Sequence, residues 1–324
     1  MFRQARKQSI LFLILRDSRI KQHFYNPPLL FGARFFVLFL LPILFFAACQ
    51  SKNLPQQNAV VAREIADDLG RKISIPEKVE RVVSLAPNLT ENIFAVGAGD
   101  RIVGVTSFCN YPADAAKIEK VGDTISPNME TIVRLKPQIV FVSTASQIEN
   151  FTKTLEQQNI AVFVTNPKNL DDVFTNLRQL GEIFGTQTKT AELLNDLQSR
   201  VIAVDESVKN KSKIKTFVQI SREPLFTIGK DSFLTEIIER AGGESATKTV
   251  ATAYPKLSKE TALALNPEAI ILSVSEDNRE PNEVFAASPA MKNKRIYRVN
   301  ADIISRPSPR IVDALEQIAA DLQR

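Results

Sequence analysis

Histidine, tryptophan and cysteine are almost absent from this chain. It holds one histidine, His23, no tryptophan, and two cysteines, Cys49 and Cys109. Beyond residue 49 no histidine remains, which excludes a histidine-based catalytic triad, a histidine general base and a histidine metal ligand from that part of the chain. A single cysteine remains there, so no disulfide can form within it.

The familiar nucleotide-binding and redox motifs are missing as well. The sequence contains no GxGxxG, no GxxxxGK[ST] and no CxxC. Its carboxylates are scattered without a motif, and a site built from carboxylates alone is the one enzymatic alternative. We therefore expect that the chain is not an enzyme and that it has no cofactor and no metal site.

The excess of positive charge belongs to the start of the chain. The formal net charge is +5, but residues 1–49 hold seven lysines and arginines against one acid. The remaining chain carries 34 basic and 35 acidic side chains, a balance that gives no reason to expect nucleic-acid binding. With 324 residues, 44% of them hydrophobic, the chain has room for two globular domains.

A short apolar segment follows the basic leader. Residues 35–48 (FFVLFLLPILFFAA) lie between Arg34 and Cys49. The segment is shorter than the roughly 20 residues that a membrane-spanning helix needs. A positive flank, a short apolar core and small residues before a cleavage site are typical of a secretory signal, and a short membrane anchor is the alternative.

The residues Ala47 and Ala48 before Cys49 resemble the bacterial lipoprotein box. The resemblance implies cleavage before Cys49 and lipidation of this cysteine, so that residues 1–48 are a signal peptide. Residues 49–60 would then comprise the lipidated cysteine and a polar, flexible tether. The folded body is expected in the cell envelope, on the periplasmic or extracellular face, anchored to a membrane by the lipid.

The rest of the chain contains two weakly similar halves. Five positions are identical at a constant offset of 130, and they pair Glu130 with Glu260, Thr131 with Thr261, Leu135 with Leu265, Pro137 with Pro267, and Ser143 with Ser273. A second match, at an offset of 145, pairs Leu89-Thr90-Glu91 and Gly97 with Leu234-Thr235-Glu236 and Gly242. Each half therefore carries a glutamate at the start of the same helix.

The order of apolar runs predicts an α/β fold with two lobes. Strand patterns alternate with helical patterns, and the strands are apolar on both faces, which favours mostly parallel sheets flanked by helices. Residues 61–168 are expected to form the N-terminal lobe and residues 214–324 the C-terminal lobe. Residues 169–213 are expected to connect them through helices over 170–184 and 188–208, the second being one long backbone helix.

Local patterns also predict where helices begin. Asn88 is expected to cap a helix, with Glu91 three residues later completing a capping box. Further capping residues are expected at Asn128, before Glu130, at Ser258, before Glu260, and at Ser308, before Pro309.

Several segments resemble the substrate-binding proteins of ABC importers for cobalamin and ferric siderophores. They occur in order along residues 61–324 and are RVVSLAPNLTE (81–91), GVTSFCNYP (104–112), KIEKVG (117–122), NMETIVRLKP (128–137), YPKLSKE (254–260) and RPSPRIV (306–312). The resemblance implies a helical-backbone binding protein with a ligand held in the cleft between its lobes. It implies a monomer that works with an ABC permease and its ATPase, or, as a further alternative, a signalling receptor of the same fold.

The resemblance gives Glu130 and Glu260 a role. They match paired glutamates on the lobe surfaces that dock onto arginines of the permease, and one anionic point on each lobe would fix the orientation of the partner. The alternative is structural, because a glutamate in the first turn stabilises a helix through its dipole. Both roles are compatible.

The segments look most like the cobalamin-binding branch, which implies aromatic contacts to the ligand. Tyr254 stands where relatives place a cleft aromatic, Phe108 and Tyr111 match a second aromatic site, and Phe226 is a further candidate. Core packing is the alternative for these rings. Asp302 lies where relatives contact the ligand, and Arg306 joins it as a predicted contact.

The ligand could instead be a ferric siderophore. Two positions at which cobalamin binders often carry tryptophan hold Thr124 and Ser143 here, or their neighbours. Anionic siderophores require cleft arginines, since arginine presents a charged planar fork. The residues available for this purpose are Arg222, Arg306 and Arg310. Haem is less favoured, because only a tyrosine could bind its iron.

Overall fold

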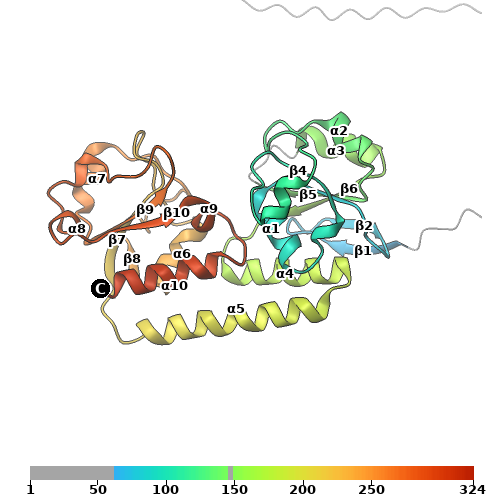
Figure 1. Ribbon diagram of the computed structural model, residues 1–324. Coiled ribbons are helices and arrows are strands. Elements are labelled where there is room, and N and C mark those ends of the chain that lie inside the picture. Colours follow the sequence, from blue (N-terminus) through green and yellow to red (C-terminus); the bar gives the residue numbers. More distant parts are fainter. Residues whose placement is uncertain (1–61, 145–148) are drawn as a thin grey trace, which may run out of the picture. The chain divides into compact units, whose positions relative to one another are not determined.

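The computed structural model describes residues 62–144 and 149–324 (Figure 1). The predicted signal peptide, Cys49 and the predicted tether lie outside the described residues. Residues from Asn58 onward belong to one compact unit, which contains two α/β lobes. In the part of the chain that the structure describes, no helix has the length and apolar character needed to cross a membrane.

The N-terminal lobe is built on a four-stranded parallel sheet with the order β4-β3-β5-β6. Its strands are β3 (Val82–Ser84), β4 (Ile102–Val105), β5 (Ile139–Ser143) and β6 (Ala161–Thr165). Its helices are α1 (Pro87–Ala95), η1 (Gly99–Arg101), η2 (Ala113–Lys117), α2 (Met129–Arg134) and α3 (Glu149–Gln157). An antiparallel hairpin precedes the sheet and is formed by β1 (Ala62–Ala66) and β2 (Lys72–Pro76).

The C-terminal lobe repeats this plan. Its parallel sheet has the order β10-β9-β7-β8, formed by β7 (Ile214–Gln219), β8 (Gly243–Ser245), β9 (Ala269–Val274) and β10 (Ile296–Asn300). Its helices are α6 (Phe233–Arg240), α7 (Lys259–Leu265), η3 (Glu283–Phe285), α8 (Pro289–Lys292), α9 (Ala301–Ile304) and α10 (Ile311–Leu322).

The two sheets have the same topology. In each lobe the second strand in chain order lies at one edge, next to the first, followed by the third and the fourth. Helices α1 and α6 follow the first strands, and helices α2 and α7 precede the third. The weak sequence repeat therefore corresponds to a structural repeat, and the predicted fold of two α/β lobes is confirmed.

Two consecutive helices connect the lobes: α4 (Leu170–Phe184) and α5 (Gln187–Val208). Gly185, with a φ of 69°, ends α4 in the left-handed conformation that allows the chain to turn. Helix α5 has 22 residues and a length of about 33 Å, and it runs beneath both lobes (Figure 1). It packs against α4 along one half of its length and against α10 along the other (Figure 1), as expected for the predicted backbone helix.

A continuous apolar core joins the lobes from below. The buried side chains on one face of the N-terminal sheet, such as Phe141, form one cluster with Leu177 of α4, Val201 of α5, Ile237 of α6 and Leu315 of α10. The other face of each sheet packs into a cluster of its own. This shared core limits how far the lobes can move apart, because bending them would expose apolar surface to water.

Two predicted helix starts are wrong. Helix α1 begins with Pro87, its N-cap is Ala86, and no side chain caps it, so Asn88 and Glu91 do not form a capping box. Helix α10 begins at Ile311, and Ser308 does not cap it. Glu91 and Ser308 were expected to act within their own helices, but they form a hydrogen bond with each other across the lobes.

Candidate functional site

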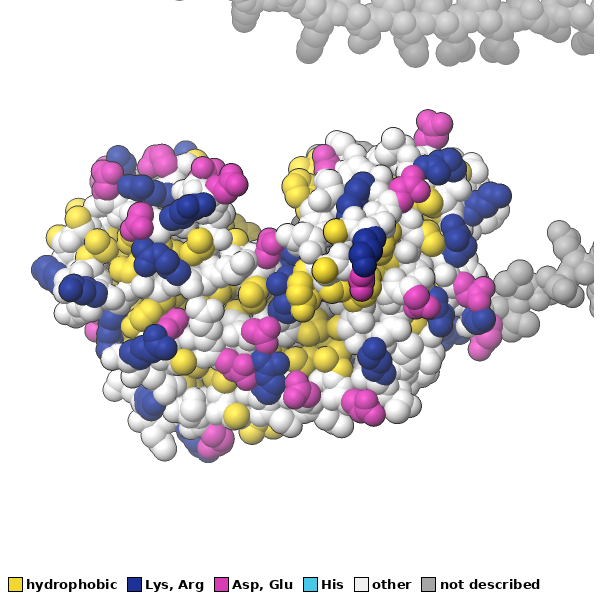
Figure 2. Space-filling view, in the orientation of Figure 1, with side chains coloured by type: hydrophobic (Ala, Val, Ile, Leu, Met, Phe, Trp, Pro, Cys, Tyr) yellow, Lys and Arg dark blue, Asp and Glu magenta, His cyan; other side chains and the backbone are white. Residues whose placement is uncertain are grey.

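A cavity with a volume of about 630 Å³ lies between the lobes. Its N-terminal wall follows the carboxyl ends of three neighbouring strands and consists of Asn88 after β3, Ser143 and Thr144 at the end of β5, and Asn166, Pro167 and Lys168 after β6. Parallel sheets bind ligands at this edge, where successive connections diverge. Figure 2 shows the surface hollowed between the lobes.

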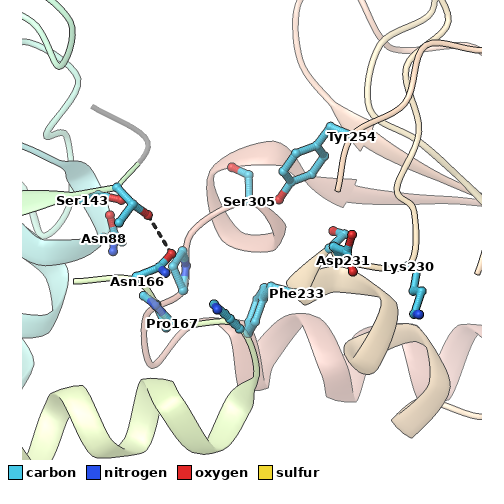
Figure 3. A pocket seen from close by; sticks show the side chains of 13 residues that line it. Asn88, Ser143, Asn166, Pro167, Lys230, Asp231, Phe233, Tyr254 and Ser305 are labelled. Atoms are coloured by element: carbon cyan, nitrogen blue, oxygen red, sulfur yellow. Dashed lines mark hydrogen bonds between the residues drawn. The ribbon is translucent and has the colours of Figure 1, made fainter. Parts of the chain in front are cut away.

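The C-terminal wall comes from three separate segments. Its residues are Lys230, Asp231, Ser232 and Phe233 at the start of α6, Tyr254, and Ser305 and Pro307 after α9. Tyr254 is 52% exposed. Its ring stands on the C-terminal side of the cavity with the hydroxyl group directed toward the middle (Figure 3). The cavity therefore has two aromatic residues, Tyr254 and Phe233, in its C-terminal wall and amide and hydroxyl groups in its N-terminal wall.

The charged groups of the cavity wall are two lysines and one aspartate. Lys168 comes from the N-terminal lobe, and Lys230 and Asp231 come from the C-terminal lobe. Two of the polar groups bind each other, since the Thr144 hydroxyl donates to Asn166 Oδ1 at 2.7 Å. None of the cavity-lining residues that the structure describes is an arginine.

Beside this cavity the two lobes meet at a seam, which is formed by Glu91 of the N-terminal lobe and by Arg306, Ser308 and Arg310 of the C-terminal lobe. The Glu91 side chain is only 2% exposed and accepts hydrogen bonds from three residues of the C-terminal lobe. Arg306 Nη1 donates to Glu91 Oε1 at 2.9 Å, and the Ser308 hydroxyl and Arg310 Nε donate to Glu91 Oε2 at 2.7 and 2.9 Å. Burial opposes the charge of Arg310, but its hydrogen bonds to Glu91 and the negative charge of that carboxylate outweigh burial and raise the pKa of the guanidinium group.

The seam also gathers three of the predicted ligand contacts. Asp302 pairs with Arg306 at 2.7 Å and accepts a hydrogen bond from Asn110 Nδ2 at 2.8 Å. The Tyr111 ring lies 4.0 Å from the guanidinium carbon of Arg310. Tyr111, Asp302 and Arg306 thus lie together at the seam, and none of the three lines the 630 Å³ cavity.

The other predicted contacts are dispersed. Tyr254 lines the cavity, whereas Phe108 and Phe226 do not. Phe108 is 58% exposed, and Phe226 is half-buried in a short pairing with Ser221 and Lys256. The roles of these residues in ligand binding stay predictions.

Sequence reasoning missed most of the polar cavity wall. Asn88, Asn166 and Ser305 were not proposed as ligand contacts, although each lines the cavity. The positions of Asn88 and Asn166 in the sequence could have indicated this role. Asn166 directly follows β6, and Asn88 follows Pro87, shortly after β3. Side chains at the carboxyl ends of parallel strands are natural candidates for ligand contacts.

Glu130 and Glu260 occupy equivalent, exposed positions on α2 and α7. Both helices lie on the side of their lobes away from α5 (Figure 1). The predicted caps are confirmed, since Asn128 accepts from the Thr131 amide at 2.9 Å and Ser258 from the Thr261 amide at 3.1 Å. Hydrogen bonds from its own backbone amide and the Ser258 hydroxyl lower the pKa of the Glu260 carboxyl, so this group is charged at neutral pH.

No group of three or more histidine, cysteine, aspartate and glutamate side chains within residues 62–144 and 149–324 could hold a metal ion. The second cysteine, Cys109, is buried and accepts a hydrogen bond from the Thr90 hydroxyl at 3.1 Å. Its environment is that of a small core residue.

Known proteins similar to this chain are solute-binding proteins. The chain is 28% identical over 298 residues to an uncharacterized ABC transporter substrate-binding lipoprotein of Bacillus subtilis, covering 87% of this chain and 94% of that protein. It is 30% identical to a vitamin B12-binding protein of Vibrio vulnificus, covering 74% and 89%. A solved structure of a possible iron-binding protein from Staphylococcus epidermidis is 26% identical, with a TM-score of 0.65 and coverage of 76% and 100%. Residues 82–303 match the model of the periplasmic binding protein family, and the chain belongs to that family.

Proposed function

We propose that this protein is the substrate-binding component of an ABC importer and that it binds a corrinoid of the cobalamin type. The ligand would occupy the cavity between the lobes. The observation that carries the proposal is the cavity itself, with the face of Tyr254 opposite Asn88, Ser143 and Asn166. A corrinoid has a partly apolar ring with amide arms, which suits an aromatic face combined with amide and hydroxyl partners.

The state of the arginines supports a corrinoid over an anionic iron chelate. Arg306 and Arg310 are both engaged by Glu91, and Arg306 also pairs with Asp302. Arg222 is 3.3 Å from Glu283. The three arginines that were predicted to be available to a ferric siderophore are therefore already paired within the protein. Their charges are compensated before any ligand arrives.

A ferric siderophore is the second candidate because one observation favours it. Lys168 and Lys230 line the cavity from opposite lobes, and no ion pair to another described residue engages either of them. Two lysines can attract the anionic oxygens of an iron chelate. The similarity to the possible iron-binding protein of S. epidermidis is in line with this candidate.

Delivery to the importer would use the two exposed glutamates. One carboxylate on each lobe, Glu130 and Glu260, can orient the protein on a permease that presents positive charges. Their equivalent positions and their exposure support this role. Lipidation of Cys49 would hold the receptor near the membrane, as the lipoprotein name of the B. subtilis relative also suggests.

A thermal-shift panel on residues 50–324 tests the choice of ligand. A ligand that binds only the folded state raises the midpoint of unfolding, Tm, by mass action. We expect cyanocobalamin to raise Tm and both ferric citrate and a ferric catecholate siderophore to leave it unchanged. A rise with either iron chelate and none with cyanocobalamin would replace the corrinoid by an iron chelate.

A further inference from the structure

The second repeated pair of glutamates, Glu91 and Glu236, has no part in the function proposed above. The two residues lie on the equivalent helices α1 and α6, each within a Leu-Thr-Glu sequence. Neither is an exposed helix-start residue like Glu130 or Glu260. The side chain of Glu91 is 2% exposed and that of Glu236 is 28% exposed.

Glu91 connects the N-terminal lobe to the start of α10. Its two oxygens bind Arg306, Ser308 and Arg310, which lie 215 to 219 residues further along the chain. The neighbouring Asn92 side chain is also buried and donates from Nδ2 to the carbonyl oxygen of Pro307 at 3.3 Å. One turn of α1 therefore holds the segment 306–310 of the opposite lobe.

Glu236 connects the C-terminal lobe to the two connecting helices. Its Oε2 accepts a hydrogen bond at 2.9 Å from the amide of Leu170, the first residue of α4. Its Oε1 accepts from Arg240 Nε at 2.9 Å, and Arg240 Nη1 reaches Asp205 of α5 at 2.9 Å. A carboxylate at the start of α4 satisfies a free amide and meets the positive end of the helix dipole.

Both glutamates act directly beside the cavity. Glu91 is three residues after the cavity residue Asn88, and its partner Arg306 lies between the cavity residues Ser305 and Pro307. Glu236 is three residues after Phe233, and its partner Leu170 is two residues after Lys168. Glu91 thus joins the two lobes directly, and Glu236 joins the C-terminal lobe to the start of α4, just after the cavity residues that follow β6.

We propose that Glu91 and Glu236 form an inter-lobe clasp that fixes the angle between the lobes and keeps the cleft open in its binding geometry. Helices α4 and α5 and the shared apolar core join the lobes from below, whereas the two glutamates act beside the cavity. The clasp adds the ion pairs of Glu91 with Arg306 and Arg310 and the hydrogen bond between Glu236 and the amide of Leu170, so the cleft is pre-organised before the ligand arrives. This positioning role does not depend on which ligand binds.

The clasp is tested by measuring the distance between the lobes without a ligand. Spin labels at Ile125→Cys and Leu263→Cys, two exposed positions in different lobes, report this distance by double electron–electron resonance. We expect a narrow distance distribution for the labelled parent and a broader or displaced one for Glu91→Gln and for Glu236→Ala. The matched controls are Glu192→Gln and Glu192→Ala, at an exposed glutamate of α5.

Two variants are used so that the measurement can be made even if one of them does not fold. Circular dichroism establishes that each labelled variant is folded, and should Glu91→Gln fail to fold, Glu236→Ala at its half-buried position carries the test. Distributions that coincide with those of the parent and the Glu192 controls would overturn the proposal. Since no ligand is present, this result is independent of whether cyanocobalamin binds.

Discussion

Glu91 and Arg310 lie 219 residues apart in the sequence and in different lobes, and Arg310 Nε donates to Glu91 Oε2 at 2.9 Å. The pair is almost buried, with side-chain exposures of 2% for Glu91 and 17% for Arg310. Arg306 completes the group on the same carboxylate. A buried carboxylate between two guanidinium groups has two consequences: it attaches the lobes to each other and it compensates the positive charge beside the cleft.

Removing the charge of Glu91 is expected to destabilise the protein strongly. Glu91→Gln leaves Arg306 and Arg310 without their shared counter-charge, and breaking a buried ion pair in this way costs about 3–5 kcal/mol. Urea denaturation followed by circular dichroism measures the free energy of unfolding. The control, Glu192→Gln, lies on the surface and is expected to change it by less than about 0.5 kcal/mol. A Glu91→Gln variant as stable as the control would contradict the account of the seam.

The Tyr254 ring is expected to contribute to ligand binding through its face. Tyr254→Ala should weaken the binding of cyanocobalamin about tenfold, the equivalent of a loss of 1.4 kcal/mol. Tyr254→Phe keeps the ring and separates stacking from the hydrogen bond of the hydroxyl group. Competition dialysis gives both dissociation constants. Unchanged affinity in Tyr254→Ala would remove this residue from the binding site.

Transport and ligand binding are expected to respond differently to the exposed glutamates. Glu130→Ala and Glu260→Ala should each reduce cyanocobalamin uptake by cells roughly tenfold, by weakening docking to the permease. Neither should change the dissociation constant of the purified protein, because both residues lie outside the cavity. Glu276→Ala, at an exposed position without an ion pair among the described residues, is the matched control. Uptake equal to that of the control would leave the two glutamates with a capping role only.

Stability is expected to fall in acid through the contact between α5 and α10. Arg200 donates from Nε to Glu316 Oε1 at 2.9 Å and also pairs with Asp313. The hydrogen bond from Arg200 and the positive charge of its guanidinium group lower the pKa of Glu316 below its ordinary value of 4.5, against a smaller opposing effect of burial. The contribution of this carboxylate is therefore present above pH 4.5 and is lost as the pH falls through the lowered pKa.

Glu316→Gln tests this linkage. The variant lacks the titrating group, so its free energy of unfolding should depend less steeply on pH below 4.5 than that of the parent. Urea denaturation across this range measures both slopes. Equal slopes would show that Glu316 is not linked to folding in this range.

Much of the fold could be predicted from the sequence because its elements carry regular local patterns. The periodic helix α4 has the predicted bounds, and α5 begins one residue earlier than expected. The short elements β8 and α9 were missed, since three or four residues are too few to show a period.

The seam could not be predicted, because its interactions are not local. Glu91 follows Asn88 at the spacing of a capping box, and that local pattern concealed partners more than 200 residues away. Ser308 before Pro309 misled in the same way, since its hydroxyl donates to Glu91 instead of capping α10. Capping patterns predict the role of a side chain only when it has no stronger partner elsewhere in the fold. For Glu91 and Ser308 the opposite lobe supplies that partner.

The location of the cleft was predicted, but most of the residues that line it were not. The position between two lobes followed from the family resemblance, and of the named ligand contacts Tyr254 lines the cavity. Tyr111, Asp302 and Arg306 lie at the seam, where they contact protein groups. The packing of the two lobes decides whether a side chain lines the cleft or contacts the other lobe. Short sequence patterns do not report this packing.

The central claim is that a corrinoid binds in the cleft of the folded protein, and calorimetric titration of cyanocobalamin into residues 50–324 tests it most directly. The method suits this chain, which lacks the tryptophan needed for a strong intrinsic fluorescence signal. The account predicts saturable binding of one cyanocobalamin per chain. A folded sample that gives no heat with cyanocobalamin and one-to-one binding with a ferric siderophore would contradict it.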